Sequence, residues 1–211
     1  WVLEEQGQGP TIIDYFQKLT NSNVEPQFSA DFSEIYFTKR GDAEHARIKI
    51  SKGEESNLIW CVFYSLLELI VEELGTAAEK RSTADFNQLK YVFIDDPVSS
   101  LDDNHLIELA VDIAKLVKSS SAGLKFIITT HNPLFYNILS NEFNNKLAKD
   151  PDAENIEWLY KPANAKKFRL DKKADGTFEL ALLDRKVPFS YHLHLLSEIR
   201  SAIASGKIKK Y

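Results

Sequence analysis

The pattern of hydrophobic and polar positions divides the 211-residue chain into helix-like and strand-like stretches. Apolar residues recur at helical spacing over residues 12–19, which predicts a short amphipathic helix. Apolar and polar residues alternate over 32–37 and over 46–50, and the Lys-Arg-Gly-Asp between them favours a turn, so we expect a hairpin with one buried face. A long helix is predicted over 51–74, opened by Ser51 and two acidic residues that suit a helix N-terminus.

The pattern after residue 90 is typical of an α/β protein. Residues 91–94 and 124–129 are continuous apolar runs, and an amphipathic helical stretch at 103–118 separates them. Because a strand, a helix and a second strand in this order form a right-handed crossover, the two strands are predicted to be parallel. The continuous apolar character of 91–94 further predicts a strand that is buried on both faces of the sheet.

Smaller elements are predicted beyond this α/β unit, with no internal repeat or low-complexity segment among them. A short helix begins at Pro133 and ends near Glu142. The elements predicted after it are strands near 156–160, 168–170 and 177–182 and a last helix over about 190–205.

Two acidic residues and a histidine stand where the parallel strands are predicted to end. Asp95 and Asp96 follow the first strand, and His131 follows the second. Because the carboxyl ends of parallel strands meet at one edge of a sheet, we expect a shared site. Asp95 is suited to hold Mg²⁺, Asp96 to orient an attacking water, and His131 to donate a hydrogen bond to a γ-phosphate. The simpler alternatives are a turn or helix cap for the aspartates and a structural role for the histidine.

Composition narrows the classes of function. The chain is 44% hydrophobic, ample for a core, and its net charge of −5 gives it no general electrostatic affinity for nucleic acid. A single cysteine, Cys61, excludes a disulfide framework and favours a reducing, cytoplasmic setting. The longest apolar stretch, 58–71, is too short to span a bilayer, so no membrane is expected among the partners.

One expected motif is missing from the sequence. No G-x-x-x-x-G-K-[ST] phosphate loop occurs, so the strand-end carboxylates have no phosphate cradle of their own. The chain also begins at Trp1, has an acidic start without a secretory leader, and contains no methionine. We therefore expect a piece of a longer protein, with the N-terminal phosphate-loop lobe outside this chain.

Four segments together resemble the motifs of ABC-type ATPase heads, in that family's order. They are the signature at Ser51, Lys52, Gly53 and Glu54, the Walker B strand at 91–96, the D-loop with Ser100 and Asp102, and the switch histidine at His131. The resemblance covers about residues 45–137. It implies an α/β head with a parallel, P-loop NTPase-like sheet flanked by helices. It also implies a head-to-head homodimer or higher oligomer, because the signature closes over a nucleotide that another protomer holds.

The signature segment has a clear physical meaning. Backbone N–H groups at the start of the predicted helix, with the Ser51 hydroxyl, form an anion site, and Gly53 permits close approach of the backbone to a phosphate. A capped helix start without a ligand is the alternative. The Walker B segment departs from the usual Asp-Glu, because Asp96 is one methylene shorter than glutamate. We therefore expect slow, regulatory hydrolysis.

Longer stretches of the chain resemble PrrC-type bacterial anticodon nucleases, notably 51–57, 93–105 and 189–194. The match runs from about 11 to 140 and resumes near 175–194. The resemblance implies an ABC-like nucleotidase portion that controls a C-terminal ribonuclease cutting a lysine tRNA during phage infection. It further implies GTP or ATP, with dTTP as another candidate, and Mg²⁺ as cofactors, and a type I restriction–modification enzyme as partner.

The same resemblance predicts three domains and their boundaries. Residues 1–30 are a helical lead-in, 31–182 are the C-terminal part of the nucleotidase head, and 183–211 are a linker and helix that lead to a nuclease domain outside this chain. The family's nuclease residues lie beyond that helix. The polar residues within it are therefore expected to be ordinary helix-face and packing residues; they are His192, His194, Glu198 and Arg200.

Two segments after residue 160 are candidates for contacts to RNA. Asp184 falls where the family's anticodon-recognition stretch is expected, and a solvated loop is the alternative. The basic residues between 161 and 173 are candidates for RNA phosphates, and a solvated strand face is the alternative.

Two other functions fit parts of the sequence. An SMC/Rad50-like DNA-repair head would have long coiled-coil arms upstream of the signature. A non-hydrolytic nucleotide-sensing defence module would bind nucleotide and a protein partner but release no phosphate.

Overall fold

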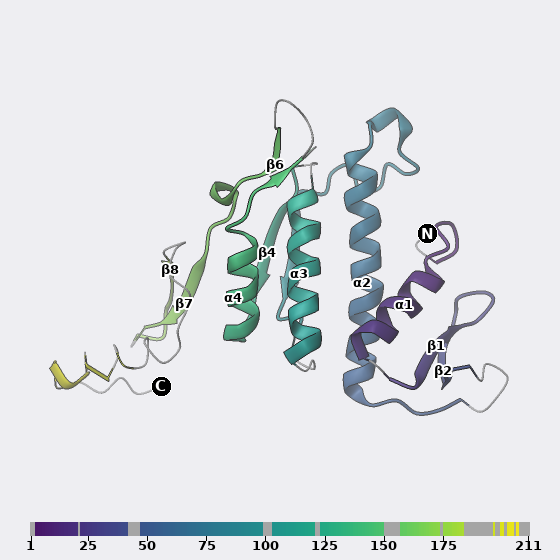
Figure 1. Cartoon of the computed structure of the whole chain (residues 1–211), viewed down its shortest axis with the longest axis horizontal. Helices are drawn as coiled ribbons and strands as arrows, with labels where there is room; N and C mark the ends of the chain where they lie inside the picture. The colour runs from purple at the N-terminus through teal and green to yellow at the C-terminus, as the bar shows by residue number, and fades with distance from the viewer. Residues whose placement is uncertain are drawn as a thin grey trace. The chain divides into compact units, whose positions relative to one another are not determined.

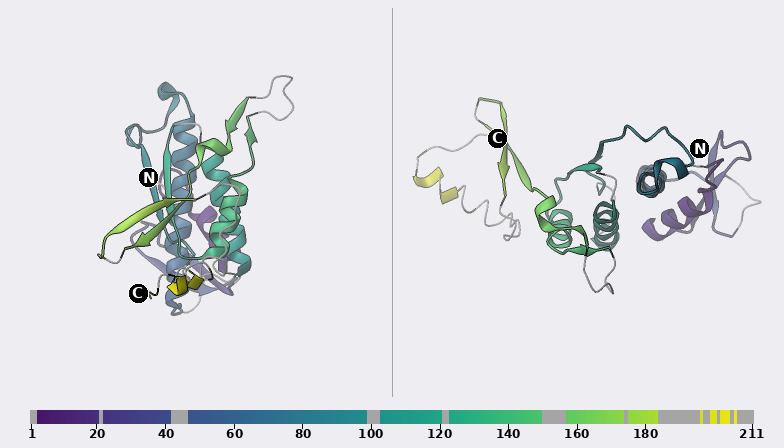
Figure 2. Two further views of the ribbon diagram at one scale, coloured as in Figure 1. Left: turned by 90° about the vertical axis from the view of Figure 1, so that its left-hand side faces the viewer. Right: turned by 90° about the horizontal axis from the view of Figure 1, so that it is seen from above.

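The computed structural model describes residues 3–20, 22–41, 47–98, 103–120, 123–149, 157–173 and 175–183, and a few positions after 195. It divides into two compact units, Trp1–Thr129 and Thr130–Tyr211. Figures 1 and 2 show the elements of each unit. In the described part of the chain, no helix combines the length and the apolar character needed to cross a membrane.

Two helices and a hairpin form the first part of unit 1. Helix α1 (Gly9–Thr20) packs on the long helix α2 (Lys52–Gly75), and both predicted helices are confirmed. Their contact buries Ile12 and Phe16 of α1 against Leu58 and Cys61 of α2. The apolar faces that the helical spacing predicted therefore meet each other.

The hairpin differs from the prediction. Strand β1 (Val24–Phe28) pairs antiparallel with β2 (Ile35–Lys39). The predicted strand at 32–37 thus corresponds to β2, and its partner precedes it in the sequence instead of following it. Residues 47–50 form no strand and contribute one backbone bond, from Ile48 N to the Phe37 carbonyl at 2.8 Å; residue 46 lies outside the described part. The sequence pattern hid β1 because Pro26 stands at its centre, and a proline within a segment normally argues against a central strand.

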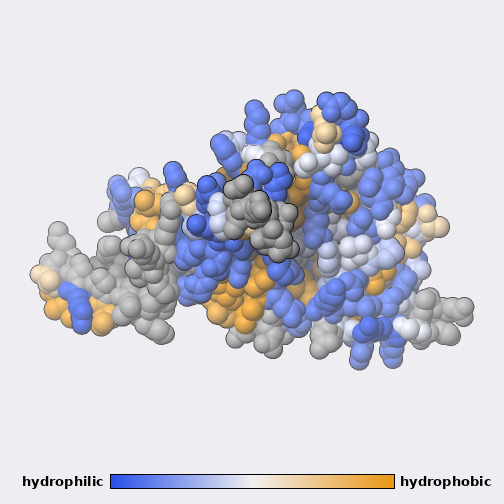
Figure 3. Space-filling view, turned by 45° about the horizontal axis from the view of Figure 1, so that its top comes forward, coloured by the Kyte–Doolittle hydropathy of each residue, from blue (hydrophilic) through white to orange (hydrophobic). Residues whose placement is uncertain are grey.

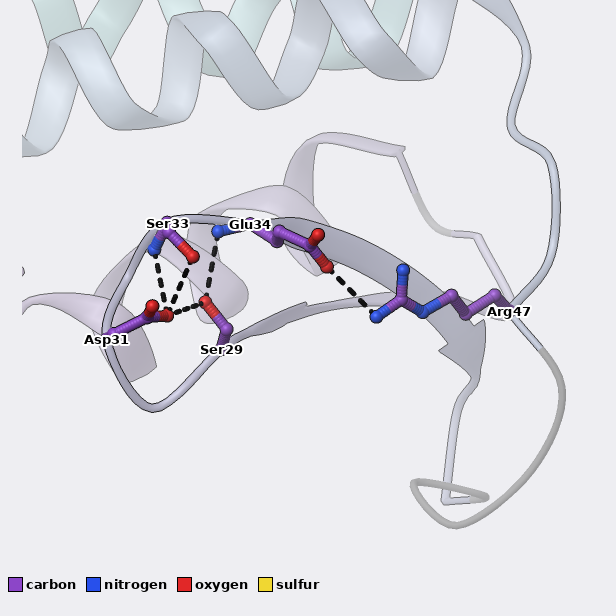
Figure 4. Close-up of polar contacts among 5 residues, drawn as sticks. All are labelled: Ser29, Asp31, Ser33, Glu34 and Arg47. Carbon is purple, nitrogen blue, oxygen red and sulfur yellow. Dashed lines mark hydrogen bonds and ion pairs between the residues drawn. The ribbon is translucent and has the colours of Figure 1, made fainter.

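A polar network closes the turn between β1 and β2 (Figure 4). The Asp31 carboxylate accepts hydrogen bonds from the Ser29 hydroxyl at 2.7 Å and from the Ser33 amide and hydroxyl at 3.2 and 2.8 Å. These bonds lower the pKa of Asp31 to about 2. Phe32 adopts a positive φ of 54° at the tip. An aspartate that bonds the amide two residues on is a turn device, so the reversal that pairs β1 with β2 lies here.

The second part of unit 1 is the predicted parallel unit. Strand β3 (Tyr91–Asp95), helix α3 (Asp103–Ser119) and strand β4 (Lys125–Thr129) follow one another, and β3 pairs parallel with β4. This confirms the α/β fold class. A short 3₁₀ turn, η1 (Ala78–Lys80), lies in the connection from α2 to β3.

The prediction that β3 is buried on both faces was wrong. Val92 and Ile94 are buried, but Tyr91 and Phe93 are each 58% exposed. Because successive side chains of a strand point to opposite faces, Val92 and Ile94 lie on the covered face of β3, and Tyr91 and Phe93 lie on an open face.

Unit 2 begins with helix α4 (Pro133–Glu142) and continues with short strands. These elements are β5 (Leu147–Ala148), β6 (Trp158–Tyr160), the 3₁₀ turn η2 (Pro162–Asn164), β7 (Phe168–Lys172) and β8 (Phe178–Leu182). The short helix and the three late strands are confirmed, and β7 pairs antiparallel with β8. The helix predicted over 190–205 lies largely outside the described residues.

Apolar side chains remain exposed on several of these strands, and Figure 3 shows hydrophobic patches among the hydrophilic surface. On the β7–β8 hairpin, cross-strand pairing places Phe168 opposite Leu182 and Leu170 opposite Leu180. All four side chains are between 46% and 69% exposed. A two-stranded hairpin is marginally stable by itself in water.

Candidate functional site

The candidate site starts at the carboxyl ends of β3 and β4. The parallel register places Asp95 directly opposite Thr129. The Thr129 hydroxyl donates a hydrogen bond to Asp95 Oδ1. The Asp95 side chain is exposed, so it can reach a ligand outside the sheet.

Asp96 turns the chain sharply out of the strand. Its backbone has a positive φ of 44°, in the left-handed region that residues other than glycine seldom adopt. The Asp96 amide donates to the Thr129 carbonyl at 3.0 Å, which extends the pairing of the two strands by one step. Val98 is buried shortly afterwards. The change of direction therefore falls between the paired strand end and the buried Val98 side chain.

A groove of about 320 Å³ lies beside these carboxylates, between the end of β3 and the N-terminal half of α2. From β3 and the turn after it, the groove is lined by residues 93–97. From α2 it is lined by Ser56, Asn57, Ile59, Trp60 and Phe63. Its walls are mainly apolar, with polar groups from the end of β3 and from Ser56 and Asn57 of α2, which is the general make-up of small-molecule sites.

The predicted signature forms a complete capping box at the start of α2. The Ser51 hydroxyl accepts from the Glu54 amide at 3.2 Å, and the Glu54 carboxylate accepts from the Ser51 amide at 2.8 Å. Lys52 and Gly53 are the first two residues of the helix. The Ser-x-x-Glu spacing thus has a structural role of its own, because it satisfies helix-end N–H groups that have no partner inside the helix.

Glu54 also holds two hydroxyl groups. Its Oε2 accepts from the Ser51 hydroxyl at 2.9 Å, and its Oε1 accepts from the Ser22 hydroxyl at 2.9 Å. The bond from the Ser51 backbone amide is the main cause that lowers the pKa of Glu54, and the two serine hydroxyls lower it further. The carboxylate is therefore held in its charged form at the start of α2.

His131 lies in unit 2, at the entrance to α4. It is exposed and stands directly before Asn132, the N-cap of that helix. The Asn132 side chain accepts from the amides of Leu134 and Phe135 at 2.9 and 3.1 Å. This cap and the proline at the first helical position fix the backbone beside the histidine.

The remaining predicted site residues are outside the described part of the chain. Ser100 and Asp102 of the D-loop lie in the gap between 98 and 103, and Asp184 lies just after 183. Their roles stay predictions. Among the described site residues, the structure brings Asp95 and Asp96 together in unit 1, beside the N-terminal half of α2.

Two contributing residues were missed by reasoning from the sequence. Thr129 was predicted only as a strand residue. The predicted parallel strands end at Asp95 and at Thr129, so pairing the two ends would have placed these residues opposite each other. Ser22 carried no signal, because its bond to Glu54 spans 32 residues and depends on the packing of α1 on α2.

Part of the basic run between 161 and 173 is occupied by internal bonds. Lys167 is buried, and its Nζ donates to the Ser140 carbonyl and hydroxyl and to Asn144. Arg169 pairs with Asp171 at 2.7 Å, and Lys173 pairs with Glu179 at 2.9 Å. These three cations are engaged by groups of unit 2, which argues against their being part of an open RNA-binding face.

The donors at the strand end fit a hard divalent cation. Asp95 and Asp96 offer carboxylate oxygens, which Mg²⁺ prefers, and Mg²⁺ is commonly held by one or two carboxylates together with substrate phosphates. Within the described residues there is no group of three or more His, Cys, Asp or Glu side chains that could hold a metal alone. The residues present thus suit a metal that arrives with a phosphate ligand.

Comparison with known proteins identifies relatives at the level of family and sequence. A family described as an AAA domain (AAA_13) matches residues 10–204. A protein of Escherichia coli named anticodon nuclease is 49% identical over 215 residues, covering 100% of this chain and 50% of its own length. The chain thus spans about half the length of that curated relative.

Solved structures of SMC heads share a general likeness with the chain. One, from work on ATP-driven dimerisation and DNA-stimulated activation of SMC ATPases, has a TM-score of 0.45 at 18% identity and covers 97% of this chain and 94% of its own. Another, an Smc head with a coiled coil and joint from Pyrococcus yayanosii, has a TM-score of 0.46 at 17% identity and covers 92% and 29%.

Proposed function

The chain belongs to the AAA_13 family of AAA domains, and from this premise we propose that it is the nucleotide-binding regulatory portion of an anticodon nuclease. The observation that carries the proposal is the 49% identity to the Escherichia coli anticodon nuclease over the whole chain. The carboxylates at the end of β3 support it, since they provide the oxygen donors that a nucleotide-bound cation needs.

Each site residue has a role in this proposal. Asp95, positioned by Thr129, holds Mg²⁺, and Asp96 orients the attacking water. His131 senses the γ-phosphate. The signature residues Ser51 to Glu54 and the D-loop residues Ser100 and Asp102 face a nucleotide bound by a second head. GTP, ATP and dTTP are the candidate nucleotides, and bound Mg²⁺ would neutralise charge on their phosphates.

The proposal extends to the wider setting that the resemblance to PrrC-type anticodon nucleases implies. Two heads close on nucleotide as a head-to-head dimer, and hydrolysis releases the closed form. That change gates a ribonuclease, outside this chain, which cleaves a lysine tRNA in anti-phage defence. A type I restriction–modification enzyme is the proposed partner that keeps the nuclease latent, and the cytoplasm is the proposed location.

Incubation of the full-length protein with total tRNA, with and without GTP or ATP and Mg²⁺, tests this function. We expect cuts at one anticodon that depend on nucleotide and are lost in Asp95→Asn. Asp85→Asn is the matched control, because it removes one exposed carboxylate in the connection before β3.

Two results would point elsewhere. Intact tRNA together with nucleotide-dependent DNA binding would favour an SMC/Rad50-like head. Nucleotide binding without any phosphate release or tRNA cleavage would favour a sensing module.

A further inference from the structure

At the start of α2, where the proposed function puts a nucleotide phosphate, the Glu54 carboxylate holds the donors of Ser51. Its Oε2 accepts both donors of Ser51, the amide at 2.8 Å and the hydroxyl at 2.9 Å. A serine hydroxyl has one hydrogen to donate. While Glu54 holds that hydrogen, Ser51 has none for a phosphate.

The second oxygen of the carboxylate is held by a residue outside the signature. Ser22 donates its hydroxyl hydrogen to Glu54 Oε1 at 2.9 Å. The same Ser22 oxygen accepts from the Val24 amide at 3.2 Å, at the start of β1, which directs the hydroxyl hydrogen away from that amide. Ser22 is in turn attached to the end of α1, because its amide donates to the Thr20 hydroxyl at 3.4 Å. The carboxylate is thus held from two segments of the chain at once.

We propose that Glu54 is an internal competitor for nucleotide phosphate at the α2 N-terminus, and that Ser22 is the positioning residue that keeps it there. This inference rests on the proposed function. A phosphate entering the site must displace the carboxylate from Ser51, since two anions compete for one set of donors. Ser22 thereby couples the α1–β1 connection to the affinity of the signature for nucleotide.

The comparison of Glu54→Gln with Glu55→Gln in the full-length protein tests the role of Glu54. Glutamine can still complete a capping box, so the helix start is retained. Both variants remove one negative charge from the first turn of α2, but only Glu54 holds Ser51. We expect Glu54→Gln to lower the dissociation constant for the Mg²⁺ complex of GTP or ATP by roughly two- to fivefold relative to Glu55→Gln. Equal affinities of the two variants would overturn the proposal.

The role of Ser22 is tested by a double-mutant cycle. Ser22→Ala is expected to tighten nucleotide binding in the wild-type background and to change it little in the Glu54→Gln background, because its effect passes through the carboxylate. Ser22→Thr keeps a hydroxyl and is expected to restore the wild-type affinity. A purely structural role of Ser22 would instead weaken binding in both backgrounds, and that result would overturn the positioning role.

The two levels of the proposal fail in different ways. If all these proteins bind nucleotide with the same affinity, the competition is disproved and the proposed function stands. If none binds nucleotide, both are disproved. Melting temperatures measured without nucleotide show whether each variant is folded at the temperature of the binding assay.

Discussion

Asp96 has to satisfy a backbone and a side-chain requirement at one position. Its φ of 44° is in a region where aspartate and asparagine are several-fold enriched among residues other than glycine. A longer side chain such as glutamate has no comparable local preference. The turn geometry therefore gives a physical reason for an aspartate at this position, where the ABC-type motif that the segment resembles usually has glutamate.

Substitutions at Asp96 separate these two requirements. Asp96→Asn is expected to keep the melting temperature, because asparagine tolerates the left-handed backbone, and to slow phosphate release so that nucleotide stays bound. Asp96→Ala is expected to slow phosphate release equally and also to lower the free energy of unfolding by about 1 kcal/mol. Phosphate-release assays and thermal melts on both variants check this. Unchanged phosphate release in Asp96→Asn would remove the water-orienting role.

Among the secondary-structure elements, α2 shows how a local sequence sets a helix start. Ser51 and Glu54 satisfy each other's backbone donors, and Glu54 adds a negative charge where the helix dipole favours one. These interactions form within four residues. They therefore stabilise the helix end without the help of a ligand.

Ser51→Ala removes the N-cap and is expected to lower the free energy of unfolding by about 1 kcal/mol. The matched control is Ser56→Ala, five residues along the same helix, where the hydroxyl only bonds back to the Lys52 carbonyl at 3.0 Å. A serine bonded in this way inside a helix is slightly unfavourable, so the control is expected to be neutral or stabilising. Urea unfolding of both variants measures the difference. Equal loss in the two would show that Ser51 does not act as a cap.

The capping box also predicts an acid dependence. The Ser51 amide and the serine hydroxyls hold the pKa of Glu54 below its ordinary value of 4.5. A lowered pKa means that the charged carboxylate stabilises the folded state above the unfolded value, and that this contribution is lost as the pH falls through the folded one. Unfolding curves at stepwise lower pH should therefore show a smaller loss of stability in Glu54→Gln than in the wild type. An unchanged acid dependence would contradict the assigned cause.

On the scale of the whole molecule, a contact between residues 53 apart in sequence joins α1 to α2. The Tyr15 hydroxyl donates to the Glu68 carboxylate, and the rings of Tyr15 and Tyr64 meet edge to face at 5.4 Å. Burial raises the pKa of both tyrosines above the ordinary value of 10.0, and Glu68 raises both further. The neutral phenols are therefore favoured in the folded state.

This contact predicts a loss of stability in alkaline solution. A raised pKa means that the stabilisation is fully present below about pH 10 and is lost as the pH rises above it, because the unfolded tyrosines ionise first. Tyr15→Phe is expected to lower stability at neutral pH and to flatten the alkaline decline. Urea unfolding at neutral pH tests the first effect, and alkaline unfolding followed by tyrosinate absorbance tests the second. Ionisation of all tyrosines before unfolding would contradict the burial of this pair.

Much of the fold was predictable because its elements are local. The spacing of apolar residues predicted helices α1, α2 and α3. The order of strand, helix and strand predicted the parallel pair that brings Asp95 beside Thr129. The β1 strand was missed, because Pro26 breaks the local pattern while cross-strand bonds to β2 maintain the strand. The exposed face of β3 was also unpredictable, since an apolar run does not say which layers cover it.

The sequence by itself determined the helices and the parallel strand pair, where the acidic residues fall, and how α2 is capped. These features depend on neighbours within a few residues, whose spacing is written in the chain. Only the tertiary structure decided that Ser22 holds Glu54, that Tyr15 meets Glu68, and that Asp96 takes a left-handed backbone. The first two join segments tens of residues apart, and all three depend on how helices and strands pack, so local pattern carries no signal for them.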